Sequence, residues 1–195
     1  GNGSAEFIQF AIAPIIARIY TPKEFAYFVI CMTLSDIILS FCSLKFEIGI
    51  NKFFKENKNY LLVSISSSFI ITTILSFIIL LVSLVFFQGS FNYTNVSYWL
   101  SIYLLVNIFN IYRSTELYFI SETRYKKVVK AKVISKFVIN ISQVLFSFFG
   151  KFGLIIGRLV GLVVGIFTFK INMFSFNDVF SKNTIKKTIN LFKRN

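Results

Sequence analysis

Long apolar blocks recur along this chain, and they constrain its fold more than any other feature. Each block is about as long as the roughly 20 residues that a helix needs to cross a bilayer. Hydrophobic residues make up 55% of the chain and its mean hydropathy is +0.72, both far above a soluble domain. The sequence therefore predicts an all-α integral membrane protein, a bundle of six transmembrane helices. The predicted spans lie near 5–20, 25–44, 60–87, 97–118, 128–149 and 153–169.

Basic residues cluster in every second connection between these blocks. The chain carries 21 Lys and Arg against 8 Asp and Glu, a net charge of +13. Most of this charge lies in 45–58, in 119–136 and after residue 169, and the other connections hold only Arg18, Lys23 and Lys151. Because Lys and Arg favour the cytoplasmic side, this alternation predicts that both ends of the segment are cytoplasmic. Membrane topology explains the charge, so no nucleic-acid partner is expected.

A short polar stretch, Thr21-Pro-Lys-Glu, separates the first two blocks. Thr21 can accept a hydrogen bond from the amide of Glu24, and Glu24 can reach back to Thr21. Pro22 then occupies the first helical position, where no amide hydrogen is needed. The stretch predicts a tight helical hairpin at the outer face. Arg18 lies just inside the apolar block, where it either snorkels to the headgroups or lines an aqueous cavity.

Three of the predicted spans carry polar side chains at helical spacing, so that each set falls on one face. In the second span the set is Thr33, Asp36, Ser40, Ser43 and Glu47. In the fourth it is Tyr103, Asn107, Asn110 and Ser114, with Arg113 at the edge. In the fifth it is Lys132, Lys136, Asn140, Gln143 and Ser147.

Such stripes have two interpretations. Polar groups can join helices through hydrogen bonds, which suits the serines. Helix joining does not require Asp36, Arg113 or Lys136, since a charge at mid-bilayer costs about 2.5–3.5 kcal/mol on insertion scales. Charged stripes on three helices therefore favour a shared water-filled cavity.

The sixth block carries a glycine every fourth residue, and this spacing predicts close packing against another helix. Arg158 interrupts the same helix and is a further candidate for the cavity. The glycines are Gly153, Gly157, Gly161 and Gly165. The segment 171–195 is basic and amphipathic, as in a helix lying on anionic lipid or a linker to a further domain.

The sequence predicts no metal site and no cofactor. It contains no histidine and only two cysteines, Cys31 and Cys42. Eleven residues along one helix place these two about 16 Å apart, too far for a disulfide.

Several motifs together resemble bacterial polysaccharide and O-antigen flippases, members of the multidrug/oligosaccharidyl-lipid/polysaccharide superfamily. The stretch APIIARIYTPKEFAYF (13–28) is similar to the first hairpin of these proteins, with Ala26 where the family usually has Gly. The segments 44–54, 121–136 and 152–165 resemble the end of their second helix, the basic connection into the fifth, and the glycine-rich sixth. The residues that match in the hairpin are Arg18, Tyr20, Thr21, Pro22 and Phe25.

The resemblance implies one lobe of a two-lobed transporter rather than an enzyme. Residues 1–170 would form the six-helix lobe, 171–195 would form its tail or the link between lobes, and a second lobe would follow, so we expect an amino-terminal fragment. The implied cargo is an oligosaccharide on a polyprenyl pyrophosphate, carried across the bacterial cytoplasmic (inner) membrane for polysaccharide or lipopolysaccharide synthesis. Membrane lipids and other polysaccharide-assembly proteins would be its partners.

The resemblance also assigns roles to the polar residues of the spans. Cationic side chains would hold the pyrophosphate, and amides would replace the water around the sugar. The cationic candidates are Arg18, Lys45, Arg113, Lys136 and Arg158, and the amide candidates are Asn107, Asn110, Asn140 and Gln143. Asp36 and Glu47 are candidates for coupling transport to a proton or cation.

Three other functions are open from the sequence. A multidrug exporter of the same superfamily would favour carboxylates in its cavity. A membrane-embedded enzyme of polysaccharide synthesis usually needs a long loop with paired carboxylates or histidine. A small channel or scaffold subunit would assemble from several copies of the chain.

Overall fold

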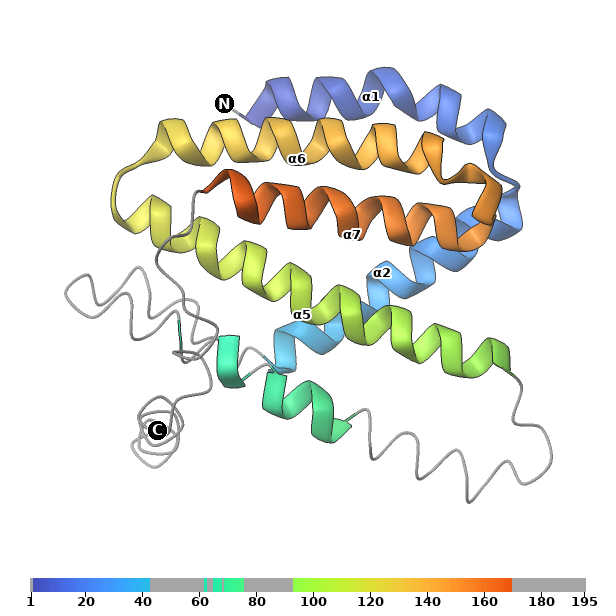
Figure 1. Cartoon of the computed structure of the whole chain (residues 1–195), viewed down its shortest axis with the longest axis horizontal. Helices are drawn as coiled ribbons and strands as arrows, with labels where there is room; N and C mark the ends of the chain where they lie inside the picture. Colours follow the sequence, from blue (N-terminus) through green and yellow to red (C-terminus); the bar gives the residue numbers. More distant parts are fainter. Residues whose placement is uncertain (1, 43–61, 63–64, 68, 76–92, 170–195) are drawn as a thin grey trace.

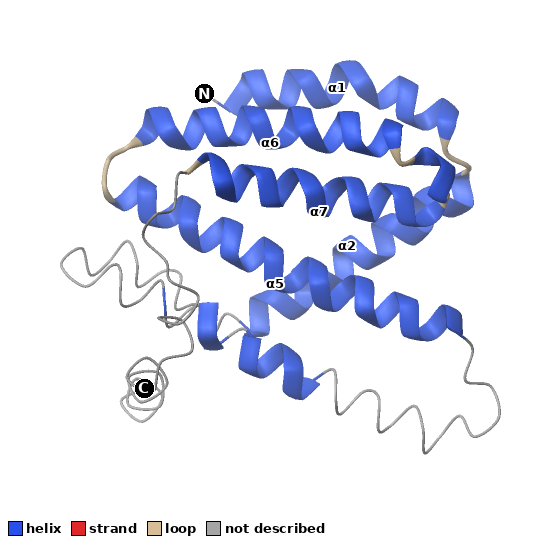
Figure 2. Ribbon diagram, viewed as in Figure 1, coloured by secondary structure: helices blue, strands red, loops and turns tan. Residues whose placement is uncertain are grey.

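The computed structural model describes residues 2–42, 62, 65–67, 69–75 and 93–169, and within these residues every regular element is a helix (Figures 1 and 2). The all-α class is therefore confirmed for the described part of the chain. The long helices are α1 (Asn2–Ile19), α2 (Pro22–Cys42), α5 (Tyr93–Ser121), α6 (Tyr125–Leu145) and α7 (Lys151–Thr168). A 3₁₀ turn, η2 (Ser147–Phe149), joins α6 to α7, and residues 65–67 and 69–75 are also helical.

The helices agree with five of the predicted spans to within a few residues. The prediction for 60–87 lies mostly outside the described residues, as do Ser43, Lys45, Glu47 and the tail 171–195. Of the helices described, α7 alone is long and apolar enough to span a membrane when judged by length and composition. The others mix apolar residues with charges, as in α6 with its lysines. That the chain crosses the membrane six times therefore stays a prediction.

The hairpin between α1 and α2 has the predicted cap. The backbone amide and the hydroxyl of Thr21 each donate to a carboxylate oxygen of Glu24, at 2.8 Å. The amide of Glu24 donates in return to the Thr21 hydroxyl, at 3.4 Å. Helix α2 begins at Pro22, as expected. The hydrogen bond from the Thr21 amide, and to a smaller extent the one from its hydroxyl, lower the pKa of the Glu24 carboxyl below its usual value.

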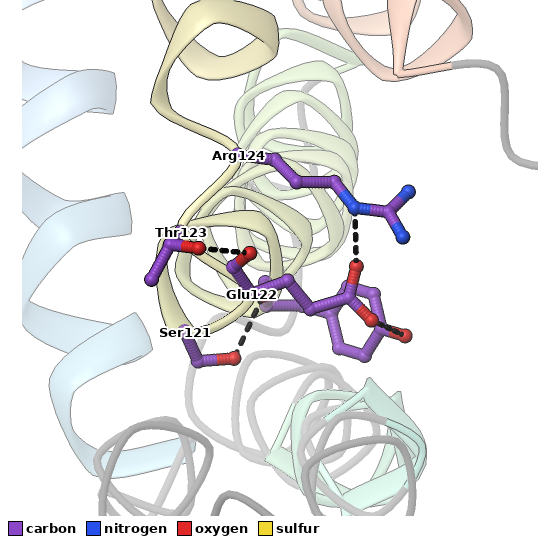
Figure 3. A network of polar contacts seen from close by, with 5 residues as sticks. Ser121, Glu122, Thr123 and Arg124 are labelled. Carbon is purple, nitrogen blue, oxygen red and sulfur yellow. Dashed lines mark hydrogen bonds and ion pairs between the residues drawn. The ribbon is translucent and has the colours of Figure 1, made fainter.

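A polar network shapes the turn between α5 and α6 (Figure 3). The Glu122 carboxylate accepts a hydrogen bond from the Tyr118 hydroxyl at 2.5 Å and forms an ion pair with Arg124 at 3.0 Å. Thr123 adopts a left-handed φ of 59°, and its amide donates to the carbonyl of Ile120. These contacts reverse the chain and bring α6 back alongside α7 (Figure 1).

The glycines of α7 allow α6 to lie against it, which confirms the close packing predicted from their spacing. A Cβ at Gly161 would lie 2.7 Å from the backbone nitrogen of Ile139, and one at Gly157 would lie 2.6 Å from that of Gln143. Such contacts are too short for any side chain. Ser135 fastens the same pair by donating to the carbonyl of Gly161 at 2.8 Å.

The turns that the structure describes lie at two opposite ends of the bundle (Figure 1). The α1–α2 and α6–α7 turns lie at one end, and the α5–α6 turn lies at the other (Figure 1). At the first end the Tyr20 hydroxyl donates to the carbonyl of Gln143 at 2.5 Å. The Glu24 carboxylate also approaches Gly150 closely there.

The described helices bury a set of polar side chains beside an apolar core, and they expose large apolar side chains. Each long helix presents large apolar side chains outward, with exposures of 85% for Phe10, 50% for Ile37, 57% for Leu100, 64% for Leu145 and 75% for Phe167. The buried polar set is Ser35, Ser66, Ser67, Thr72, Ser101, Asn107, Asn110, Ser114, Thr115, Ser135, Asn140, Ser142 and Gln143.

Candidate functional site

A pocket of about 100 Å³ lies between α1, α2, α6 and α7, and it collects four of the predicted site residues. These are Lys136, Asn140 and Gln143 of α6 and Arg158 of α7. Its other lining residues are apolar: Ala13, Ile16, Phe25, Phe28, Ile139 and Leu154. Two cations and two amides therefore share one small hollow in an apolar wall, and the lining that is described includes no carboxylate.

The α6–α7 contact determines which side chains meet in the pocket. Asn140 and Gln143 follow Lys136 at helical spacing, so all three lie on one face of α6. The glycine contact holds that face next to α7, where Arg158 directly follows Gly157. Gln143 fixes the arrangement, because its side-chain amide donates to the carbonyl of Leu154 at 3.1 Å.

Two hydrogen-bond donors at the pocket lack partners. The side-chain nitrogen of Asn140 and the Nε of Arg158 are buried and form no hydrogen bond. Asn140 is only 2% exposed, so bulk water does not supply the missing acceptor. Buried polar groups are nearly always paired, so an unpaired donor in a pocket indicates a place for an acceptor from a ligand or water.

The charge of Arg158 is only partly compensated by the protein. Its guanidinium lies 5.9 Å from the ring centroid of Phe109, and it feels the electrostatic attraction of Asp36 on α2. The described residues include no ion pair of Arg158 within 4.0 Å. Lys132 on α6 differs from Arg158, because it forms an ion pair with Glu116 of α5 at 2.6 Å.

The amide candidates on α5 lie in a helix–helix contact away from this pocket. Asn107 accepts a hydrogen bond from Thr72 at 3.2 Å and donates to the carbonyl of Tyr103 at 2.9 Å. Asn110 is fully buried and accepts from Ser114 at 3.5 Å. Through Asn107 the α5 stripe therefore joins α5 to the helical residues 69–75, which favours helix joining over a cavity on this face.

The remaining candidates are dispersed. Arg18 is exposed in the last turn of α1, where a positive charge complements the helix dipole. Arg113 and Asp36 are also exposed, on α5 and α2. Lys45 and Glu47 lie outside the described residues. Two other stripe residues of α2, Thr33 and Ser40, donate to carbonyls of their own helix at 2.9 Å.

Sequence reasoning did not find Tyr20 and Phe109 as residues of the site. The Tyr20 hydroxyl fastens α1 to α6 at Gln143, and Phe109 supports the Arg158 guanidinium. An aromatic residue at the end of a span is typical of the membrane interface, so the position of Tyr20 carried no signal for this contact.

Comparison with known proteins gives no relative, because no family model, curated protein or solved structure matches the chain. The part of the chain that the structure describes also contains no cluster of three or more His, Cys, Asp or Glu residues suited to a metal ion. The chemistry of the site therefore has to be read from the pocket.

Proposed function

We propose that the chain is a six-helix lobe of a flippase that moves polyprenyl-pyrophosphate-linked oligosaccharides across the bacterial cytoplasmic membrane. The proposal rests on one observation above all. Four residues predicted from the sequence to line a cavity, on two separate helices, line one pocket in an otherwise apolar wall: Lys136, Asn140, Gln143 and Arg158.

The membrane part of the proposal is supported by the distribution of polarity. Apolar side chains face outward on every long helix of the described part, and amides and hydroxyls face inward. Lipid tails would cover the outer surface without any loss of hydrogen bonds, since the backbone groups of a helix are paired internally. The charge alternation between connections supports cytoplasmic ends for the segment.

The transport part is supported by the charges and the unpaired donors of the pocket. A pyrophosphate presents several acceptor oxygens and negative charge, which two cations and an amide donor complement by charge-assisted hydrogen bonds. The pocket has about the volume of three waters. It has room for a phosphoryl group and none for a sugar, so the oligosaccharide would occupy space next to it, between this lobe and a second one. Rocking of two such lobes would give alternating access.

The described pocket favours this function over the multidrug alternative. Exporters of cationic drugs need acidic groups at the site, and the described lining of this pocket carries two cations. Asp36 acts electrostatically on Arg158, but it is exposed on α2 outside the lining.

The test is transport by the full-length protein in vesicles that contain a fluorescent polyprenyl-pyrophosphate-linked sugar. Lys136→Met and Arg158→Met, singly and together, should slow translocation by at least tenfold, because each removes a charge from the pocket. Lys132→Met is the matched control. It removes a lysine one turn earlier on α6 that is already paired with Glu116 outside the pocket, so its rate should stay within about twofold of wild type.

The result that would remove the proposal is normal transport by the double variant, in protein that remains monodisperse in detergent. Efflux of cationic drugs by the wild-type protein, without movement of the lipid-linked sugar, would establish the multidrug alternative instead.

A further inference from the structure

The side chain of Lys151, the first residue of α7, lies among three aromatic rings from three helices. Its ammonium nitrogen is 4.8 Å from the ring centroid of Tyr27 on α2, 5.7 Å from that of Tyr98 on α5 and 5.2 Å from that of Phe152 on α7. The rings also contact one another, with centroids 3.9 Å apart for Tyr27 and Tyr98 and 5.9 Å for Tyr27 and Phe152. We call these three rings the aromatic cage.

A lysine at the end of a membrane helix normally extends toward water or lipid headgroups. Lys151 turns inward instead, although Glu24 reaches the adjacent Gly150. No ion pair of Lys151 occurs among the described residues. Its ammonium is therefore held by the faces of the rings, an attraction that grows as the site loses water. One side chain thus ties the start of α7 to α2 and α5.

The aromatic cage covers the interior of the bundle. Tyr27 is only 4% exposed, and Cys31, one turn deeper on α2, is completely buried. Both belong to one apolar cluster that includes Leu105 of α5 and Ile155 of α7. Tyr27 and the Lys151 ammonium over its ring therefore lie one helical turn from Cys31, on the side toward this end of the bundle.

We infer that Lys151 is a latch that closes this end of the helix bundle, and that its release from the aromatic cage separates α7 from α2 and α5 and uncovers Cys31. In the proposed orientation this end is the outer face. The role of the latch in substrate release rests on the proposed function, whereas the closure itself does not. A transporter that opens outward must loosen these helices, and one side chain that touches all three is placed to control the step.

Thiol labelling of the full chain in detergent tests the latch. Cys42→Ser leaves Cys31 as the only thiol, because the chain has two cysteines. The rate of labelling with a charged maleimide then reports how often Cys31 is uncovered. Lys151→Met keeps much of the side-chain length without the charge, and it should raise this rate by about tenfold or more. Lys151→Arg retains a cation that stacks on rings, and it should label at the wild-type rate.

Two further variants keep the test decisive. Lys23→Met removes an exposed lysine from the same end of the bundle, and its rate should equal that of the wild type. Tyr98→Leu removes one ring and leaves Lys151 in place, so it should raise the rate less than Lys151→Met does. It also supplies the answer if Lys151→Met does not fold, as judged by its helical circular dichroism.

The inference is overturned if Lys151→Met, or Tyr98→Leu in its place, labels no faster than wild type. It is equally overturned if Lys151→Arg labels as fast as Lys151→Met, since the cation would then be irrelevant. These outcomes do not depend on transport. A working latch in a protein that moves no lipid-linked sugar would disprove only the proposed function.

Discussion

The polar stripes of α5 and α6 have the same pattern in the sequence, but their asparagines differ in hydrogen bonding in the structure. On α5, Asn107 has partners for both its oxygen and its nitrogen, in Thr72 and the carbonyl of Tyr103. On α6, the side-chain nitrogen of Asn140 has no partner and lies at a pocket beside Lys136 and Arg158. Both asparagines are almost completely buried.

The difference shows that the role of a polar helix face depends on the residues that it meets in the fold. The α5 stripe faces the hydroxyls of Thr72 and Thr73, which form hydrogen bonds with Asn107 and Tyr103. The α6 stripe faces the glycines and Arg158 of α7 and leaves donors unused. A buried asparagine with all its partners serves stability, and one with an unpaired donor can bind a ligand.

Gly161→Leu should have the largest effect, because it disrupts the contact between α6 and α7 that forms the pocket. A side chain at this position would collide with the backbone of Ile139, and the pocket would lose its shape. We expect a loss of stability of about 3 kcal/mol or a failure to fold, measured by thermal unfolding in detergent. Phe167→Leu, at an exposed position of the same helix, should change stability little. A normal melting temperature for Gly161→Leu would contradict the close packing of α6 and α7.

Replacement by leucine should have different effects on stability at the two asparagines. Asn107→Leu removes the hydrogen bonds to the Thr72 hydroxyl and to the carbonyl of Tyr103, so it should cost about 1 kcal/mol. Asn140→Leu removes a donor that has no partner, so the melting temperature should stay the same or rise while transport falls. Thermal unfolding and transport of both variants give the answer. If Asn140→Leu destabilised the protein as much as Asn107→Leu does, the two stripes would be equivalent.

Removing single hydroxyl groups tests the difference between the α5 and α6 stripes with smaller expected effects. Thr72→Val loses the bond to Asn107, and Ser135→Ala loses the bond to the carbonyl of Gly161. Each should cost about 0.6 kcal/mol, the average for hydrogen bonds between membrane helices. Only Ser135→Ala should also affect transport, because only it touches the helix pair that forms the pocket. Equal transport by the two variants would argue against that link.

The smallest effect is expected at the α1–α2 hairpin, which belongs to neither stripe. Thr21→Ala removes the hydroxyl that caps α2 and should lower the melting temperature by less than about 2 °C at neutral pH. Because the pKa of Glu24 is lowered in the folded state, its contribution is present above the unfolded pKa and is lost as pH falls through the folded value. The difference between wild type and Thr21→Ala should therefore shrink in acid. A difference independent of pH would exclude a part for the carboxylate.

Local features of this fold could be predicted from the sequence because their partners lie within a few residues. Thr21 and Glu24 form the expected cap, and the spacing from Gly153 to Gly165 correctly indicated a close helix neighbour. The joining of Lys136 and Asn140 on one face of α6 follows from helical periodicity alone.

Contacts between helices could not be predicted, because they depend on which faces meet. Nothing in the spacing of the α5 stripe shows that the Thr72 hydroxyl lies opposite Asn107. The position of Lys151 among rings from three helices likewise depends on tertiary packing, and its charge alone suggested a residue at the membrane surface. Arg158 was recognised as a cavity candidate, but its pocket became visible only once α6 lay against the glycines.

The central claim, that the α6 stripe faces a wet pocket and the α5 stripe does not, is tested most directly by thiol accessibility. Single cysteines at positions 136, 158, 107 and 110, in a chain with Cys31 and Cys42 replaced by serine, are exposed in vesicles to a membrane-impermeant maleimide on either side. The account predicts that positions 136 and 158 are labelled from one side while 107 and 110 stay protected. Protection of all four positions from both sides, or equal labelling of all four, would contradict it.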